Sequence, residues 1–140
     1  MSNLDPILIQ SYRKAVYRIN AANSHINFFI DKENPDLDKL LKMHDVRTAA
    51  LITAHNPLSQ EMGAAENTHA HETLLEELRT AGHRWLVGEG ADPDGQWLPE
   101  TSIMVLGIDE AAANTLAAQF GQNAYVWIAA GAPPSLVLVR

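Results

Sequence analysis

Residues 48–90, TAALITAHNPLSQEMGAAENTHAHETLLEELRTAGHRWLVGEG, contain three successive segments with different hydrophobic periodicity. The apolar run at 48–56 predicts a buried strand that ends in polar residues. Leucines recur at helical spacing within 65–82 and predict an amphipathic helix, which a glycine closes. The β-rich segment 83–90 predicts a second strand. A strand, a helix and a strand therefore follow one another without an interdomain linker.

The same alternation continues toward the C-terminus. Residues 101–107 and 123–130 predict strands, and 109–121 between them predicts a helix that Asp109 caps. The resulting order, β-α-β-β-α-β, is that of the ferredoxin-like arrangement, an antiparallel sheet with two helices on one face. We therefore expect an α+β protein whose ferredoxin-like core spans residues 46–130.

Residues 1–45 predict a helix/strand/helix extension that packs on this core. Asp5 and Asn34 each precede a proline that is followed by helically spaced apolar residues, so each is expected to cap a short helix. Two β-rich runs between these helices are separated by the turn-like NAANS, residues 20–24, and predict adjacent strands. At the other end, 133–140 (PPSLVLVR) predicts a C-terminal edge strand, because proline cannot donate to a ladder. We expect all 140 residues to form a single domain.

The composition narrows the classes of function. The formal net charge of −7 disfavours general binding to nucleic-acid backbones. There is no cysteine, so thiolate catalysis and cysteine-bound metal centres are excluded. No apolar run is long enough to span a bilayer and the first residues do not resemble a signal peptide, so we expect no membrane partner and a cytoplasmic location. The glycines of GEG, residues 88–90, do not form a phosphate loop, and no cofactor is expected.

The polar residues between the first predicted strand and its helix are the strongest site candidate. Asn56 and Ser59 follow the strand, and Asn67 lies at the start of the helix. At about 100° per residue, His71 falls on the same face as Asn67, toward the leucine stripe, whereas His69 falls on the opposite side. The two histidines of the HxH pair therefore cannot hold one metal ion together, and we expect no metal site.

Two interpretations of this cluster are open. Asn56, Ser59 and Asn67 could converge as hydrogen-bond donors and acceptors for a ligand, near the exposed N–H groups of a helix N-terminus. The same residues also carry a turn signature, in which asparagine side chains satisfy the backbone of a loop that leaves a sheet. The two roles are compatible.

A second group of polar residues follows later in the chain. Glu100 precedes a predicted strand, and an acid–base pair would form if Glu100 and His71 faced the same end of the sheet. Gln122 stands at a helix-to-strand junction, where it either caps helix carbonyls or orients a ligand. Trp97 either anchors its loop or covers a pocket. A Ser-His-acid triad is possible in composition with Ser102 or the earlier serine, but neither serine stands in a nucleophile elbow.

The segments AALITAHNPLS, RWLVGEGADPDGQWLPETS and FGQNAYVW, together with Asn67, resemble the bacterial domain of unknown function 3293 family (DUF3293). The resemblance covers residues 46–127 well and the N-terminal part more loosely. It implies a small single-domain bacterial protein without an assigned activity. It also favours an amide, hydroxyl and carboxylate site over histidine chemistry, because family members often carry tryptophan where this chain has His55. The residues that match the family's pattern are Asn56, Pro57, Ser59, Asn67, Gly88, Glu89, Gly90, Trp97, Glu100, Ser102 and Gln122.

We therefore expect a small polar ligand, nucleotide-like or carboxylate-bearing, and the sequence does not decide whether the protein is an enzyme. Glu100 and His71 are the candidate catalytic residues if a reaction takes place. The alternative is a non-catalytic interaction module, in which the last strand or an open sheet edge pairs with a protein partner or with a second copy of the chain. The expected ligand-binding residues are Asn56, Ser59, Asn67, Glu100 and Gln122.

Overall fold

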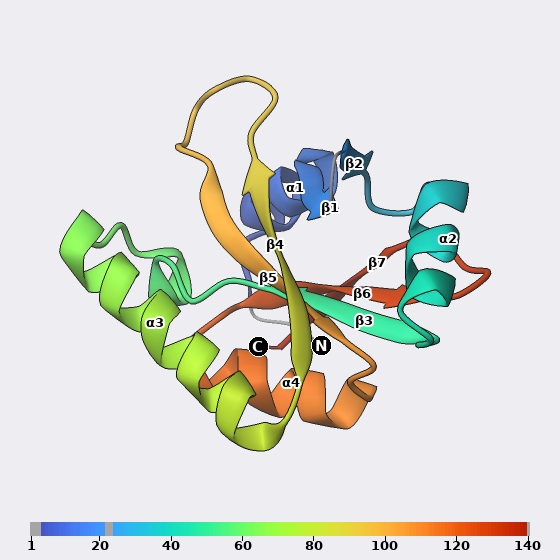
Figure 1. The fold of residues 1–140 in the computed structure, drawn as a ribbon. Coiled ribbons are helices and arrows are strands. Elements are labelled where there is room, and N and C mark those ends of the chain that lie inside the picture. Colours follow the sequence, from blue (N-terminus) through green and yellow to red (C-terminus); the bar gives the residue numbers. More distant parts are fainter. Residues whose placement is uncertain (1–3, 22–23, 140) are drawn as a thin grey trace.

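One antiparallel sheet of seven strands organises the part of the chain that the computed structural model describes, residues 4–21 and 24–139. The strands lie in the order β2-β1-β4-β5-β3-β6-β7, and the sheet is strongly curled (Figure 1). The strands are β1 (Val16–Ala21), β2 (Ser24–Phe28), β3 (Thr48–Ile52), β4 (Arg84–Ala91), β5 (Glu100–Leu106), β6 (Ala124–Ala129) and β7 (Ser135–Leu138). The helices are α1 (Pro6–Lys14), α2 (Pro35–Met43), the short 3-10 helix η1 (Pro57–Ser59), α3 (Ala64–Ala81) and α4 (Glu110–Gln119).

The central elements follow one another as the sequence predicts: β3, α3, β4, β5, α4 and β6. Helices α3 and α4 cover one face of the sheet (Figure 1). Leu74 and Leu78 of α3 and Ala117 of α4 are buried there in one cluster with Ile52 and Val105 of the strands. The α+β class is therefore confirmed.

Helix α2 packs on the opposite face. Its Leu37, Leu40 and Leu41 belong to a second buried cluster, which contains Leu51 and Met104 of the sheet. Successive residues of β3 and β5 contribute to the two clusters in turn, as the alternation of side chains along a strand requires. Both faces of the central strands are therefore covered.

The predicted helix caps are observed. Asp5, Asn34 and Asp109 each accept a hydrogen bond from a backbone N–H in the first turn of the helix that follows. Gly82 and Gly121 have φ values of 79° and 68° and lie just beyond α3 and α4, where a left-handed residue is needed. These local signals fix the helix ends because they depend on a few neighbouring residues only.

The N-terminal hairpin joins the sheet through β4. Strands β1 and β2 pair antiparallel as predicted, although residues 22 and 23 of the expected turn lie outside the described residues. Strand β1 also pairs with β4, and a Cβ atom on Gly88 would come within 2.4 Å of the Arg18 carbonyl oxygen. Only glycine allows the two strands to approach so closely, so the first glycine of GEG has a structural role.

The last strand, β7, lies at an edge of the sheet and pairs with β6. The Val139 N–H donates to the Asn123 carbonyl oxygen at 2.8 Å and extends this pairing by one residue. The C-terminal edge strand expected from the sequence is thus present. Among residues 4–21 and 24–139, no helix combines the length and the hydropathy of a transmembrane segment.

Candidate functional site

A cavity of about 870 Å³ opens between α1, the loop that joins β4 to β5, and the beginning of α3. This volume lies in the range of ordinary small-molecule pockets. Its lining combines apolar strand residues such as Leu51 and Val126 with polar side chains from the loops. The cavity is therefore made by segments that are far apart in the sequence.

The structure brings together in this cavity all five residues that the sequence nominates for ligand binding: Asn56, Ser59, Asn67, Glu100 and Gln122. His55 also lines the cavity, whereas His71 does not. The His71 ring instead lies edge-on to that of His55, with 6.1 Å between the ring centroids. The face of α3 was predicted correctly, because Asn67 and His71 are partly buried and His69 is exposed.

Asn56 is the centre of the polar network. Its Nδ2 donates to Glu100 Oε2 at 2.7 Å, and its Oδ1 accepts from Asn67 Nδ2 at 2.9 Å and from the Met62 N–H at 2.9 Å. The Asn56 N–H in turn donates to Asn67 Oδ1 at 2.9 Å. One side chain thus joins the end of β3, the start of α3 and the first residue of β5. These hydrogen bonds satisfy the backbone of the loop, as the turn interpretation expects, and they hold in place the same side chains that would bind a ligand in the ligand-site interpretation.

The backbone of this segment is strained. Asn56, Leu58 and Ser59 have φ values of 48°, 57° and 57°, in the left-handed region that residues other than glycine rarely adopt. Each such residue costs about 1–3 kcal/mol, and this strain concentrates at functional sites. The Leu58 N–H donates to the Gly121 carbonyl oxygen at 2.6 Å and ties the segment to the end of α4. The surrounding hydrogen bonds hold the strained conformation in place.

Ser59 and Gln122 are held by the neighbouring backbone and side chains. The Ser59 hydroxyl shares a 2.7 Å hydrogen bond with the Tyr12 hydroxyl and accepts another from Asn123 Nδ2 at 3.0 Å. Buried Gln122 donates through Nε2 to the carbonyl oxygens of His55 and Phe120. Gln122 therefore does cap a helix carbonyl, as the conservative interpretation expects, and it lines the cavity as well.

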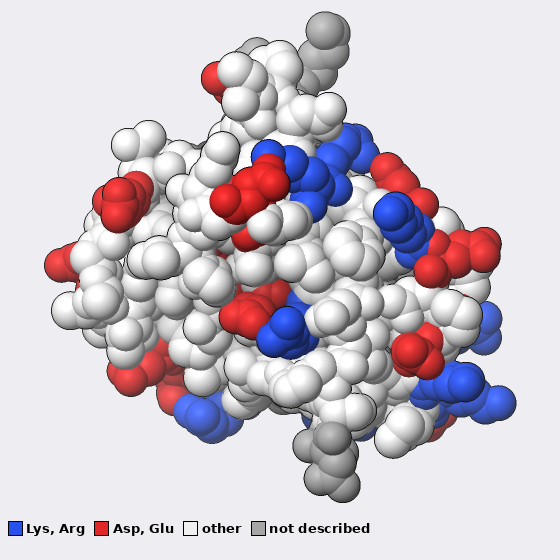
Figure 2. All heavy atoms as spheres, turned by 90° about the horizontal axis from the view of Figure 1, so that it is seen from above, with Lys and Arg blue, Asp and Glu red and all other residues white. Residues whose placement is uncertain are grey.

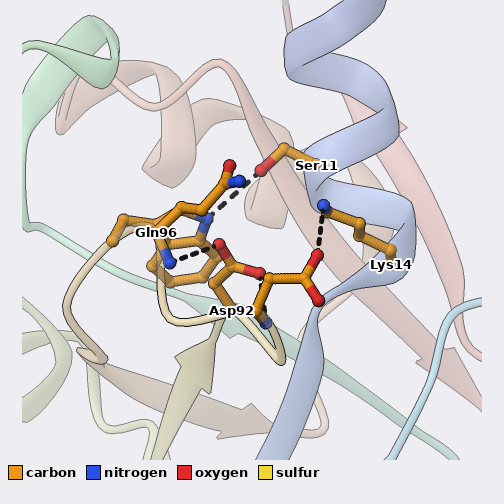
Figure 3. A network of polar contacts seen from close by, with 6 residues as sticks. Ser11, Lys14, Asp92 and Gln96 are labelled. Carbon is orange, nitrogen blue, oxygen red and sulfur yellow. Dashed lines mark hydrogen bonds and ion pairs between the residues drawn. The ribbon is translucent and has the colours of Figure 1, made fainter.

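The roof of the cavity, α1 and the β4–β5 loop, is closed by polar contacts (Figure 3). Trp97 Nε1 donates to Ser11 Oγ at 3.2 Å, and Lys14 Nζ lies 2.8 Å from Asp94 Oδ2. The buried Asp92 carboxylate accepts from the backbone N–H groups of Asp94 and Gln96 and shapes the turn. Trp97 therefore has both of its proposed roles, since it anchors the loop and lines the cavity.

Sequence reasoning missed the contribution of α1. Ser11, Tyr12 and Leu8 of this helix line the cavity, as does Tyr17 of β1. The sequence showed only that α1 is amphipathic, and nothing in the local pattern says which distant loop that helix covers. Burial raises the pKa of the Tyr17 hydroxyl, which donates to the Tyr12 carbonyl oxygen at 2.8 Å.

Burial also changes the acidity of the other titratable groups at the site. It raises the pKa of Glu100 above its usual value, and the hydrogen bond from Asn56 opposes part of this rise. It lowers the pKa of His55 and of His71, so both imidazoles favour the neutral form near pH 7. A carboxylate whose pKa is raised in a cavity is a recurrent feature of functional sites.

The histidines do not form the catalytic pairs considered from the sequence. Among the described residues, Glu100 makes its side-chain hydrogen bond with Asn56, and His71 Nδ1 is buried without a partner. The Ser59 hydroxyl bonds Tyr12 and Asn123, and the Ser102 hydroxyl donates to the Glu100 carbonyl oxygen. Neither of these two serines therefore has an imidazole partner among the described residues. Within residues 4–21 and 24–139, no three His, Asp or Glu side chains lie close enough to hold a metal ion.

Comparison with known proteins adds a family. The model of a family described as "Protein of unknown function (DUF3293)" matches residues 52–125, just over half of the 140-residue chain. No curated protein and no solved structure matches the chain. The matched range contains all five cavity residues nominated from the sequence, whereas α1 lies outside it.

The Asn56 network provides a direct test of the loop. Replacing Asn56 with alanine removes its side-chain hydrogen bonds. It also puts alanine, which tolerates the left-handed conformation less well than asparagine, at this position. We therefore expect the free energy of unfolding to fall by about 2–4 kcal/mol. Asn56→Gly removes the same bonds but relieves the backbone strain, so it should lose less. Urea unfolding measures both changes. Equal stability of Asn56→Ala and the parent would contradict the network.

The raised pKa of Glu100 predicts an effect of pH on stability. The folded state holds this proton more tightly than the unfolded state, so the contribution to stability is full below the ordinary value of 4.5 and is lost as the pH rises through the folded pKa. Glu100→Gln keeps an acceptor for Asn56 and removes the charge, so near neutral pH it should be at least as stable as the parent. Unfolding free energies of both proteins between about pH 4 and about pH 8 test this. A difference between them that does not change with pH would contradict the assignment.

Proposed function

Since the chain belongs to the DUF3293 family, whose description names no activity, we propose a function from the cavity itself: the protein binds a small polar ligand there. The observation that carries the proposal is the convergence of five polar side chains, from four separate segments of the chain, on one cavity of about 870 Å³. They come from the β3–α3 segment, α3, β5 and the α4–β6 junction, and they are Asn56, Ser59, Asn67, Glu100 and Gln122.

The hydrogen-bond network supports this proposal because it fixes the polar groups before a ligand arrives. Asn56 positions Glu100 and Asn67 through its amide, and Gln122 is tied to the His55 carbonyl oxygen. Polar groups that are held in place lose little freedom when a ligand binds, which favours affinity. Asn67, Glu100 and Gln122 would contact the ligand, Ser59 would bond it, and Asn56 would act mainly by positioning.

The same geometry supports ligand binding more strongly than catalysis. Glu100 meets one condition for a general base, a pKa raised by burial. The second condition, a partner such as His71 within hydrogen-bond reach, is not met among the contacts of the described residues. Any reaction at this site would therefore depend on Glu100 and on groups of the ligand.

We interpret the four central strands and their two helices as a ferredoxin-like core within a single domain. The element order β-α-β-β-α-β, the sheet order β4-β5-β3-β6 and the position of α3 and α4 on one face support this interpretation. On this view the N-terminal hairpin and β7 extend the core sheet at its two ends. A cytoplasmic location and a bacterial origin stay predictions from the sequence.

An interaction module is the second candidate, and the edge strand β7 favours it. Val139 donates its N–H to β6, and donors alternate along an antiparallel strand, so the Leu138 N–H points away from the sheet. An open edge of this kind accepts a further strand, from a protein partner or from a second copy of the chain.

Ligand binding is tested by thermal unfolding with nucleotides, amino acids and sugar phosphates. A selective ligand should raise the melting temperature, because it stabilises the folded state by about 2.7 kcal/mol at a hundredfold excess over Kd. Asn67→Ala should lose this rise, measured from its own baseline. The control Asn114→Ala changes an exposed residue of α4 and should keep the rise. Retention of the full rise in Asn67→Ala, or no rise with any compound, would argue against the cavity as the binding site.

The edge-strand candidate is tested by Leu138→Pro. Proline removes the outward N–H without removing a bond to β6, so association of the chain should be lost while the circular dichroism spectrum is kept. Leu138→Ala keeps the N–H and is the matched control for the lost side chain, so it should still associate. Light scattering after size-exclusion chromatography measures the mass of each. A parent that is monomeric at every concentration, or a proline variant that associates like the parent, would exclude pairing of copies through this edge.

A further inference from the structure

The charges that line the cavity are all of one sign. Among the described residues, its ionisable side chains are Glu61, Glu100, His55 and three tyrosines, and neither lysine nor arginine lines it. His55 favours the neutral form near pH 7, because burial lowers its pKa. A phosphate or carboxylate group of a ligand would therefore meet negative charge here, and no cationic side chain would offset its desolvation.

Two cations on the elements beside the cavity belong to other contacts. Lys14 of the roof pairs with Asp94, and Arg18 of β1 lies 3.5 Å from Glu89 and donates to Asn27. Neither cation lines the cavity. Figure 2 shows acidic and basic side chains interspersed over one face of the molecule, whereas the described residues that line the cavity include glutamates and no cationic side chain of lysine or arginine.

Glu100 is only half satisfied. Its Oε2 accepts from Asn56, but its Oε1 accepts no hydrogen bond within residues 4–21 and 24–139. A partly buried carboxylate that lacks both a countercharge and a second donor is costly to keep ionised. A ligand that brings a positively charged N–H donor would remove both deficits at once.

The free side-chain oxygen of Gln122 also favours a ligand that donates a hydrogen bond. Its Nε2 is used twice, for the His55 and Phe120 carbonyl oxygens, and its Oε1 has no donor among the described residues. Five of the hydroxyl and indole donors around the cavity are directed to protein acceptors instead. These donors belong to Tyr17, Thr53, Trp97, Ser102 and Tyr125. The open atoms of Glu100 and Gln122 thus accept hydrogen bonds and call for donors.

The aromatic side chains of the lining suit a cation as well. Tyr12, Tyr17, Trp97 and Tyr125 all line the cavity. The negative face of an aromatic ring attracts an ammonium or guanidinium group, most strongly where water is excluded. Aromatic rings beside a carboxylate therefore suit an organic cation.

We propose that the ligand of this cavity is an organic cation, a compound with a protonated amine or guanidine that donates to Glu100 Oε1 and to the Gln122 carbonyl oxygen. This inference rests on the proposed function, because it names the chemical class of the ligand bound there. It replaces the expectation from the sequence, a nucleotide-like or carboxylate-bearing ligand, because a phosphate or carboxylate group would meet Glu61 and Glu100 in the lining. Charge complementarity also accounts for a lining in which the described residues include two glutamates but neither lysine nor arginine.

The test compares compounds that share a skeleton and differ in charge. One trio is phenethylamine, hydrocinnamate and hydrocinnamamide, another is tryptamine with the corresponding indole acid and amide, and agmatine adds a guanidine. Thermal unfolding and calorimetry near neutral pH should rank the amine above the neutral amide and the acid in each trio. Glu100→Gln should weaken amine binding about tenfold or more, since a hydrogen bond to a charged group is lost.

The control Glu33→Gln removes the same charge from an exposed residue that does not line the cavity, so it should leave amine binding unchanged. Equal loss in both variants would mean that net charge and not Glu100 attracts the amine, and would overturn the inference. If the acids bind as well as the amines, or if only an anionic compound of the wider ligand screen binds, the inference falls while ligand binding stands. If no compound of either set binds, both fall.

Discussion

The rest of the site depends on the hydrogen bonds made by the side-chain amide of Asn56. It bonds Asn67 at the start of α3, the backbone of Met62 and the carboxylate of Glu100 at the start of β5. These groups reach Asn56 from three separate segments, and its own backbone is left-handed. A side chain that can both donate and accept, on a residue that tolerates this conformation, fulfils all these requirements, and asparagine is the residue that does so at least cost.

The position of Glu100 follows from that contact. A carboxylate at the edge of a cavity would turn toward water if nothing held it, but the Asn56 Nδ2 fixes one oxygen and leaves the other open. Burial then raises the pKa of Glu100, since the charged form has lost part of its hydration. The stability lost by holding this charge is offset elsewhere in the fold, in the two buried clusters on either face of the sheet. Functional sites commonly hold groups that reduce the stability of the fold, and the remaining structure offsets the loss.

The N-terminal segment covers part of the sheet surface and forms one side of the cavity. Strand β1 pairs with β4 at the close approach that Gly88 allows, and α1 then lies against the β4–β5 loop through the Trp97 and Lys14 contacts. Helix α1 has no buried residue of its own, so it is held by these contacts, by its cap and by the hydrogen bonds of Tyr12 with Ser59 and Tyr17. The exposed Lys14–Asp94 ion pair adds little to this stability.

The sequence by itself determined the α+β class, the order of the helices and strands, the caps at Asp5, Asn34 and Asp109, and the face of α3 that carries Asn67. These features depend on periodicity and on neighbours within one helical turn, which a sequence states directly. It also nominated five polar residues that prove to line one cavity, because polar groups at strand and helix ends stand out from their apolar surroundings.

Only the tertiary structure decided how those residues are used. It joined Glu100 to Asn56 across 44 positions of the chain, left His71 beside His55, and brought Tyr12 within 2.7 Å of Ser59. It also showed that, within residues 4–21 and 24–139, neither lysine nor arginine lines the cavity. Such contacts depend on the curl of the sheet and on the path of segments far apart in the chain, so no local pattern specifies them. The charge of a cavity is a property of the surfaces that enclose it, and the residues of those surfaces meet only in the folded protein.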